Sequence, residues 1–369
     1  MLQLLKRTAM ASPGDRAPAW LRWLPVLVLL GLLPAHLLTP DNVRLSFLIV
    51  AMPPLAALVN GPLFTSLLSL VAITEFVLFY LLADTPDGWH DTATDGLSTM
   101  FGIVVMSILM AWVRDRYNNR LVRVSTVARS AQLALLPHIP DAVGALRCAA
   151  WYRPAEQDTM VGGDMFDVQD TSYGVRVMVA DVKGHGLGVV ATVAALLGSF
   201  REGALDDSTL DGIGGRLERR MAWDNAGRDE WRTSFATSLL MEFPPGNREV
   251  RLTSFGHPTP LLLRRGRVRE LVAPPGPPLG LAGQLRGGVT TVSARLQTDD
   301  VLLAYTDGVT EARDRQGTFY PLVERVTRRL ADEPHVTAAQ LVEFIDVDLD
   351  DFGARRRDDM AVLAIRVSP

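Results

Sequence analysis

The chain has 369 residues, of which 48% are hydrophobic, and its formal net charge is −4. This length predicts two or three domains, and so mild a charge argues against nucleic acid as the main partner. The single cysteine, Cys148, excludes an intramolecular disulfide, and we interpret it as a small buried thiol because no His or Asp pattern marks it as activated.

Residues 20–113 are far more apolar than the rest of the chain. Between Leu45 and Ala83 the only charged residue is Glu75, and this run is too long for one membrane span and about right for two. Asn60-Gly61-Pro62, in its middle, is typical of a turn. We therefore predict a cytoplasmic tail over 1–19 and an all-α membrane domain over 20–113, with four spans near 20–38, 43–59, 63–83 and 97–113. A cleavable signal peptide fits the first run poorly, because further spans follow it.

Charged residues flank this apolar region asymmetrically. Basic residues precede the first predicted span and follow the fourth: Lys6, Arg7, Arg16 and Arg22, then Arg114, Arg116, Arg120 and Arg123. The loop at 84–96 instead carries four aspartates and no Lys or Arg. Because an excess of Lys and Arg marks cytoplasmic segments, we predict a multi-pass protein of the cell membrane with both ends in the cytoplasm.

The segment 114–140 is predicted to be a helical linker. Its apolar positions follow a heptad seam with spacings of 4, 3, 4, 3 and 4: Tyr117, Leu121, Val124, Ala128, Ala131 and Leu135. This pattern favours a short coiled coil and a homodimer, and the alternative is a single helix that packs on its own domain. Pro137 and Pro140 end the helix.

Residues 141–369 alternate strand-like and helical runs. Strands are predicted at 145–153, 174–181, 235–243, 248–255, 259–264, 301–306 and 360–367. Helices are predicted at 186–204, 208–223, 319–331 and 337–351. Several strands follow one another directly, which indicates an α+β domain with antiparallel pairing.

Four acidic motifs fall where predicted strands end or turns begin. They are Val161-Gly162-Gly163-Asp164, Val179-Ala180-Asp181-Val182-Lys183-Gly184-His185-Gly186, Tyr305-Thr306-Asp307-Gly308 and Arg357-Asp358-Asp359-Met360. A lone Asp-Gly is usually a turn, and the glycine-rich turn after Asp181 has the alternative interpretation of a phosphate cradle at a helix N-terminus. The four motifs predict a shared site because they occur together and in this order.

Carboxylates are the ligands that hard divalent cations prefer, and Mg²⁺ or Mn²⁺ fit this set best. Zinc is disfavoured, since the chain has one Cys and no His pair at i, i+4. Two such ions that share a carboxylate activate a bridging water and neutralise a phosphoryl group, so the motifs predict two-metal hydrolysis without a covalent intermediate.

Residues 141–367 closely resemble the SpoIIE-type branch of the metal-dependent, 2C-like (PPM) protein serine/threonine phosphatases. The resemblance rests on ordered motifs: Val161-Gly-Gly-Asp164-Met-Phe-Asp167, Asp181-Val-Lys-Gly-His-Gly186, Phe255-Gly-His257-Pro, Pro275-Gly-Pro-Pro-Leu-Gly-Leu281, Tyr305-Thr-Asp307-Gly-Val-Thr-Glu311-Ala and Arg357-Asp358-Asp359-Met-Ala-Val.

The resemblance implies a β-sandwich flanked by helices, with two ions at one edge. It implies that Asp181 bridges both metals with the main-chain carbonyl of Val182 as a further ligand. It further implies that Asp307 and Asp358 complete the coordination of one ion and that Asp164 is a ligand of the other. Asp359 would orient these ligands. Gln132 to Pro137 resembles the regulatory linker helix of such domains.

Three further residues are weaker candidates. Lys183 stands where the wider 2C-like group has a histidine proposed to protonate the leaving group, and His185 lies near by. Arg153 is a candidate to bind the substrate phosphate bidentately, and the alternative is that it is a solvated arginine at a strand end. Ser254-Phe255 replaces the usual Asn-Ala before Gly256.

From these motifs and this resemblance we expect a membrane-anchored phosphatase that hydrolyses phosphoserine or phosphothreonine on a cytoplasmic, anti-anti-sigma-factor-like protein. The alternative is an inactive module of the same fold that binds a phosphoprotein. A membrane transporter or channel with a regulatory tail is a second rival, which four short spans with one buried acid disfavour.

Overall fold

The computed structural model describes residues 18–38, 46–82, 89–155, 162–184, 187–227, 233–246, 248–283, 288–354 and 358–368. The chain divides into two compact units, Met1–Arg123 and Val124–Pro369. The boundary falls inside the linker predicted at 114–140, because Gln132, Leu135 and Leu136 already pack on the second unit.

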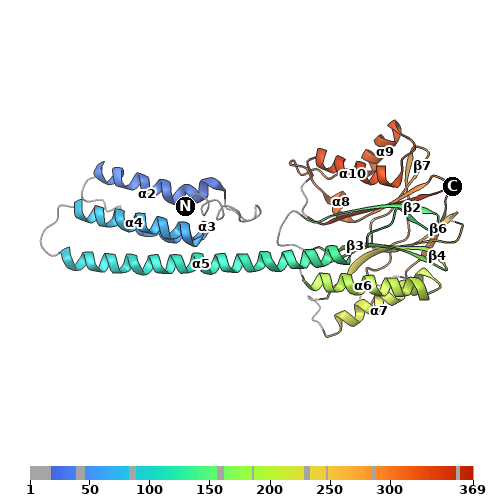
Figure 1. Ribbon diagram of the computed structural model, residues 1–369, viewed down its shortest axis with the longest axis horizontal. Coiled ribbons are helices and arrows are strands. Elements are labelled where there is room, and N and C mark those ends of the chain that lie inside the picture. Colours follow the sequence, from blue (N-terminus) through green and yellow to red (C-terminus); the bar gives the residue numbers. More distant parts are fainter. Residues whose placement is uncertain are drawn as a thin grey trace. The chain divides into compact units, whose positions relative to one another are not determined.

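The first unit is built of helices: α2 (Ala19–Leu38), α3 (Ser46–Val59), α4 (Pro62–Leu82) and the N-terminal part of α5 (Trp89–Leu135). Figure 1 shows α2, α3 and α4 alongside α5, and small and aliphatic side chains fill the space between them. The turn expected at Asn60-Gly61-Pro62 is confirmed, and Arg114 donates to the free carbonyls of Ala57 and Asn60 there, both at 2.8 Å.

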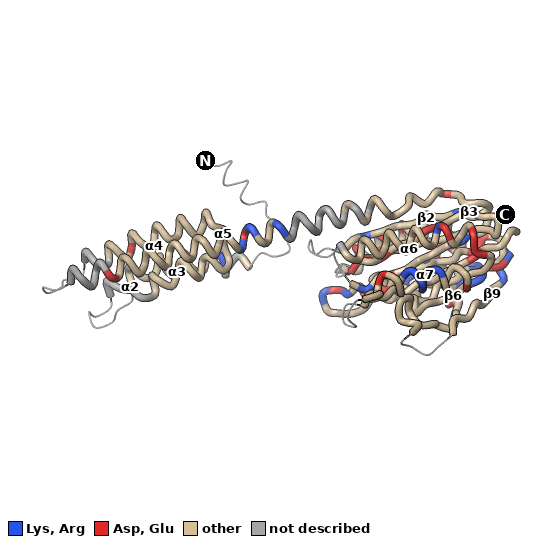
Figure 2. The backbone as a smooth tube through the Cα atoms, turned by 90° about the horizontal axis from the view of Figure 1, so that it is seen from below, with Lys and Arg blue, Asp and Glu red and all other residues tan. Residues whose placement is uncertain are grey.

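Apolar side chains also cover the outside of this unit. Leu30, Leu58, Phe101 and Met106 are each at least 60% exposed, and the tube in Figure 2 is almost free of charged residues along α2–α4. Among the described residues, two helices are long and apolar enough to cross a membrane, Asp95–Arg120 within α5 and Gly188–Asp206 within α6. The second is half buried inside the other unit. Shorter apolar stretches lie within α2, α3 and α4, at Trp20–Leu32, Leu48–Val59 and Pro62–Leu78, and the four spans stay a prediction.

The second unit is a sandwich of two antiparallel sheets. One sheet has the order β1 (Ala142–Val143), β2 (Leu146–Arg153), β11 (Met360–Val367), β10 (Val301–Tyr305), β7 (Leu261–Arg264) and β8 (Arg267–Glu270). The other has the order β3 (Asp164–Thr171), β4 (Gly174–Val182), β5 (Ala236–Phe243), β6 (Glu249–Phe255) and β9 (Thr291–Arg295). The α+β, antiparallel architecture predicted for this part is confirmed.

Helices cover both outer faces of the sandwich (Figure 1). Helices α6 (Leu187–Asp206) and α7 (Leu210–Asn225) pack on the β3–β4–β5 face, while α9 (Leu322–Asp332) and α10 (Ala338–Asp351) pack on the other sheet. The short α8 (Asp307–Glu311) follows β10. A third apolar layer lies between the sheets, so central strands such as β10 and β11 are buried on both faces and are continuous apolar runs.

Candidate metal-binding active site

The first two acidic motifs meet on neighbouring strands. In the β3–β4 ladder Asp164 lies directly opposite Asp181. Asp164 is buried, and Thr306, one residue before Asp307, donates to its Oδ2 at 2.6 Å. Three motifs that are far apart in the sequence therefore converge at one end of the sandwich.

Glycine is required where these motifs touch. A Cβ on Gly163 would lie 2.0 Å from the carbonyl oxygen of Val182, and the backbone N–H of Val182 donates to the carbonyl of Gly163 at 3.1 Å. Only a residue without a side chain allows this approach. The contact places the Val182 carbonyl, a predicted ligand, beside the loop that carries Asp164.

The third and fourth motifs lie side by side through β10 and β11. Asp307 begins α8 directly after β10, and Asp358 precedes β11. The backbone N–H of Thr306 donates to the carbonyl of Ala361 at 3.0 Å, and the N–H of Ala361 donates to Oγ1 of Thr306 at 2.9 Å. Thr306 thus ties the third motif to both the first and the last.

The carboxylates repel one another in a desolvated place. Burial, and then the charges of Asp307 and Asp358, raise the pKa of Asp181 to about 7. Burial and the charge of Asp181 raise the pKa of Asp164 well above its usual range, and burial also raises the pKa of Asp307. Divalent cations would relieve this repulsion, which otherwise favours protonation.

The donor chemistry at this place fits Mg²⁺ or Mn²⁺. It consists of carboxylate oxygens and one main-chain carbonyl, which are hard ligands. In the described part of the chain, no group of three or more His, Cys, Asp or Glu side chains is placed so that it could hold a metal ion. The charges of Asp307 and Asp358 nevertheless act on Asp181, and those of Asp181 and Asp307 act on Asp164.

Asp359 is oriented by the protein itself. It is 2% exposed, its Oδ1 accepts from the backbone N–H of Ala155 at 2.8 Å, and its Oδ2 accepts from the hydroxyl of Tyr152. These hydrogen bonds hold the carboxylate of Asp359 in place, and its role in orienting metal ligands stays a prediction.

Of the weaker candidates, Lys183 lies near the carboxylates, whereas Arg153 is paired with acidic residues of α10. Lys183 is exposed, and its charge partly offsets the rise that burial causes in the pKa of Asp181 and of Asp307. Arg153 instead donates to both carboxylate oxygens of Asp350, at 2.6 and 2.9 Å, and pairs with Asp346 on α10. These contacts occupy the edge of the guanidinium that a phosphate would need. His185 lies outside the described residues.

Several supporting residues were missed from the sequence. Thr306, Tyr152 and Gln132 contact the acidic residues of other motifs only after folding, and only Thr306 belongs to one of the four motifs. His257, part of a quoted motif, is buried with its Nδ1 2.9 Å from Oγ1 of Thr237, which lies opposite Asp181 in the β4–β5 ladder.

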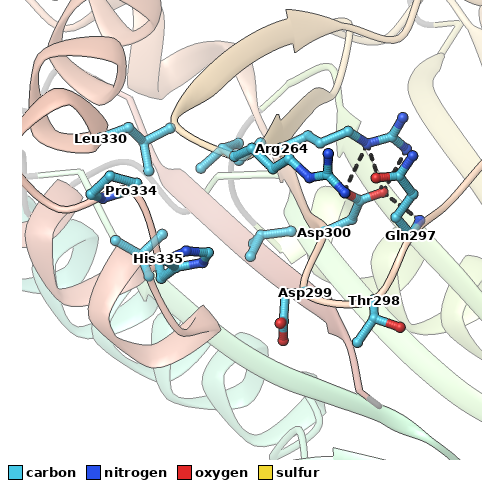
Figure 3. Close-up of a pocket in the computed structure, with 12 residues that line it drawn as sticks. Arg264, Gln297, Thr298, Asp299, Asp300, Leu330, Pro334 and His335 are labelled. Atoms are coloured by element: carbon cyan, nitrogen blue, oxygen red, sulfur yellow. Dashed lines mark hydrogen bonds and ion pairs between the residues drawn. The ribbon is translucent and has the colours of Figure 1, made fainter.

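A separate pocket of about 180 Å³ lies at the other end of β10 (Figure 3). Asp300 precedes β10 and binds the guanidinium of Arg264 there, with Nη2 to Oδ2 at 2.6 Å, beside Gln297 and His335. Asp307 follows the opposite end of the same strand. None of the predicted site residues lines this pocket, so it is separate from the site of the carboxylates.

Comparison with known proteins supports the same fold. The family model for Stage II sporulation protein E (SpoIIE) matches residues 171–368, more than half of the chain, and the matched segment begins after Asp164. The SiaA-PP2C domain of Pseudomonas aeruginosa is similar with a TM-score of 0.54 and 17% identity, over 69% of this chain and 98% of that chain.

Two further solved structures are less similar in shape. The RsbU and RsbW domains of Rv1364c from Mycobacterium tuberculosis share 26% identity over 60% of this chain and 60% of that chain, with a TM-score of 0.48. RsbX, solved in complex with magnesium, shares 17% identity over 62% of this chain and 98% of that chain, with a TM-score of 0.44.

Proposed function

The chain belongs to the SpoIIE family of PP2C-type serine/threonine phosphatases, and from this premise we propose that it is a membrane-anchored enzyme that dephosphorylates a cytoplasmic regulatory protein. The family is metal-dependent. The observation that carries the proposal is the pairing of Asp164 with Asp181 across β3 and β4, at a place where Asp307 and Asp358 also act on Asp181.

In the proposed site each ligand has one role. Asp181 would bridge two Mn²⁺ or Mg²⁺ ions and the carbonyl of Val182 would add a ligand. Asp307 and Asp358 would complete the coordination of one ion, and Asp164 would be a ligand of the other. When bound, such ions supply a nucleophilic water and neutralise the phosphoryl group. Lys183, exposed beside Asp181, would draw the phosphate toward the site.

The proposed substrate is a phosphoserine or phosphothreonine protein like an anti-anti-sigma factor. This part of the proposal follows from the family resemblance. Phosphatases of this family act on such proteins within partner-switching circuits. The proposed anchor is the first unit, whose outward apolar side chains and apolar stretch at Asp95–Arg120 suit a bilayer.

Hydrolysis of phosphopeptides by the full chain in detergent tests the proposal. We expect release of phosphate from phosphoserine and phosphothreonine peptides with Mn²⁺, and none after chelation. Binding of the phosphopeptide without phosphate release, with Mn²⁺ present, would favour the inactive binding module instead. Release that continues at the same rate after chelation would contradict the metal-dependent mechanism.

A further inference from the structure

Asp359 lies at the meeting point of the loops that carry the other acidic residues. A Cβ on Gly162 would lie 2.4 Å from its carboxyl group, and a Cβ on Gly308 would lie 1.9 Å from its carbonyl oxygen. Its own backbone N–H donates to Oδ1 of Asp358 at 2.9 Å. A shift of Asp359 would therefore displace the loops of Asp164, Asp307 and Asp358 together.

The hydroxyl of Tyr152 donates to the carboxylate of Asp359 and is itself an acceptor. Tyr152 stands near the end of β2, and the side-chain amide of Gln132 donates to its hydroxyl at 2.9 Å. The same Nε2 of Gln132 lies 3.5 Å from Oδ2 of Asp359 and 3.5 Å from the main-chain carbonyl of Asp164. A single amide group thus faces two acidic motifs.

Gln132 comes from a different part of the fold. It lies in the last turn of α5, outside both sheets, yet its side chain is 2% exposed. A buried amide among apolar residues is costly unless its hydrogen bonds are made, so its position is fixed by the partners it meets at Tyr152 and Asp359.

We propose that Gln132 and Tyr152 are positioning residues for the metal site, which hold Asp359 so that the neighbouring loops present their carboxylates to divalent cations. The inference rests on the proposed function and adds the last turn of α5 to the support of that site. Loss of groups that orient metal ligands typically lowers metal affinity by about 10- to 100-fold.

Binding of Mn²⁺ to the full chain in detergent tests the inference, with free Mn²⁺ followed by its electron paramagnetic resonance signal. The variants are Gln132→Ala and Tyr152→Phe, the second of which keeps the ring and removes only the hydroxyl. The matched control is Gln340→Ala, which removes the capping box of α10 and so costs stability away from the site. Thermal unfolding and Mn²⁺-dependent phosphopeptide hydrolysis are recorded for each.

We expect the dissociation constant for Mn²⁺ to rise about 10- to 100-fold in both variants, and the rate at saturating Mn²⁺ to fall much less. The double variant should bind no more weakly than the worse single one, because both residues act through Asp359. Gln340→Ala should lower the melting temperature and leave Mn²⁺ affinity unchanged.

Wild-type affinity in Tyr152→Phe, or equal losses in all three variants, would overturn the inference. A wild-type chain that binds Mn²⁺ but releases no phosphate would refute the proposed function alone, since the binding data would still decide the role of Gln132 and Tyr152. A wild-type chain that binds no Mn²⁺ would overturn both.

Discussion

Gly308 shows how closely the acidic motifs are packed. Its Cβ position is 1.9 Å from the carbonyl oxygen of Asp359, a main-chain atom that cannot swing aside. Gly308→Ala should therefore destabilise the fold by about 1–3 kcal/mol, through forced backbone shifts, and reduce hydrolysis. Chemical denaturation of the two proteins measures the change.

Gly198 on α6 is the matched control. It is exposed in a helix interior, and nothing lies within 4 Å of its Cβ position. Gly198→Ala should stabilise the chain by up to about 1 kcal/mol, since alanine favours the helix. Equal stability changes at Gly198 and Gly308 would contradict the close approach described here.

His257 makes stability depend on pH. Burial lowers the pKa of this imidazole from its ordinary 6.5 to about 3, against a raising effect of the backbone at Tyr305. The folded state thus holds His257 neutral. Its contribution to stability is fully present above pH 6.5 and is lost as the pH falls from 6.5 toward 3, by at most about 1.4 kcal/mol per pH unit.

The variant His257→Gln removes this titration, so its free energy of unfolding should fall less steeply with acid than that of the wild type. His335 is exposed, and His335→Gln should keep the wild-type slope. Parallel curves for all three proteins would show that His257 has no such role.

At the scale of elements, α5 joins two predicted segments into one. The linker was expected to continue from span four, and the structure has a single 47-residue helix. Leu135, the last seam position, packs against the α6 side of its own unit, as the single-helix alternative expects. The seam side chains at 121, 124, 128 and 131 lie outside the described residues, so dimerisation stays a prediction.

Light scattering of the full chain in detergent tests this prediction. We expect the mass of a dimer for the wild type and of a monomer for the double variant Leu121→Asp, Val124→Asp. The reason is that negative charges buried in a heptad seam destabilise the association of two helices. A monomeric wild type, or a double variant that stays dimeric, would show that the seam does not associate.

Apolar periodicity predicted most of the second unit. Seven strands and four helices match the structure within a few residues, because each has a long buried face. The missed strands are β1, β3, β8 and β9, and β1 has only two residues. The acid-rich β3 (Asp164–Thr171) resembles a turn in sequence, and β8 and β9 are short edge strands with exposed polar residues.

The acidic residues of the candidate site could be predicted from the sequence, but the residues that hold Asp359 in place could not. Asp164, Asp181, Asp307 and Asp358 stand out because each adjoins a glycine or a strand end. No local pattern predicts that Gln132 and Tyr152 contact Asp359, since it is more than 200 residues away from both in sequence. Only tertiary packing joins them.

At the scale of the whole molecule, we expect the first unit to anchor the chain and the second unit to catalyse. The full chain should remain with carbonate-washed membranes, whereas residues 124–369 alone should stay in the soluble fraction and keep Mn²⁺-dependent hydrolysis. Fractionation followed by immunoblotting measures this. A full chain that carbonate removes from membranes would contradict the anchor.

The gathering of carboxylates for divalent cations is the central claim, and calorimetric titration with Mn²⁺ tests it most directly. We expect about two ions bound per wild-type chain, loss of binding in Asp181→Asn, and wild-type binding in Asp170→Asn, an exposed aspartate at the far end of β3. Asp181→Asn should still fold, because it removes a buried charge that its neighbours repel. Undiminished Mn²⁺ binding by Asp181→Asn would contradict the account.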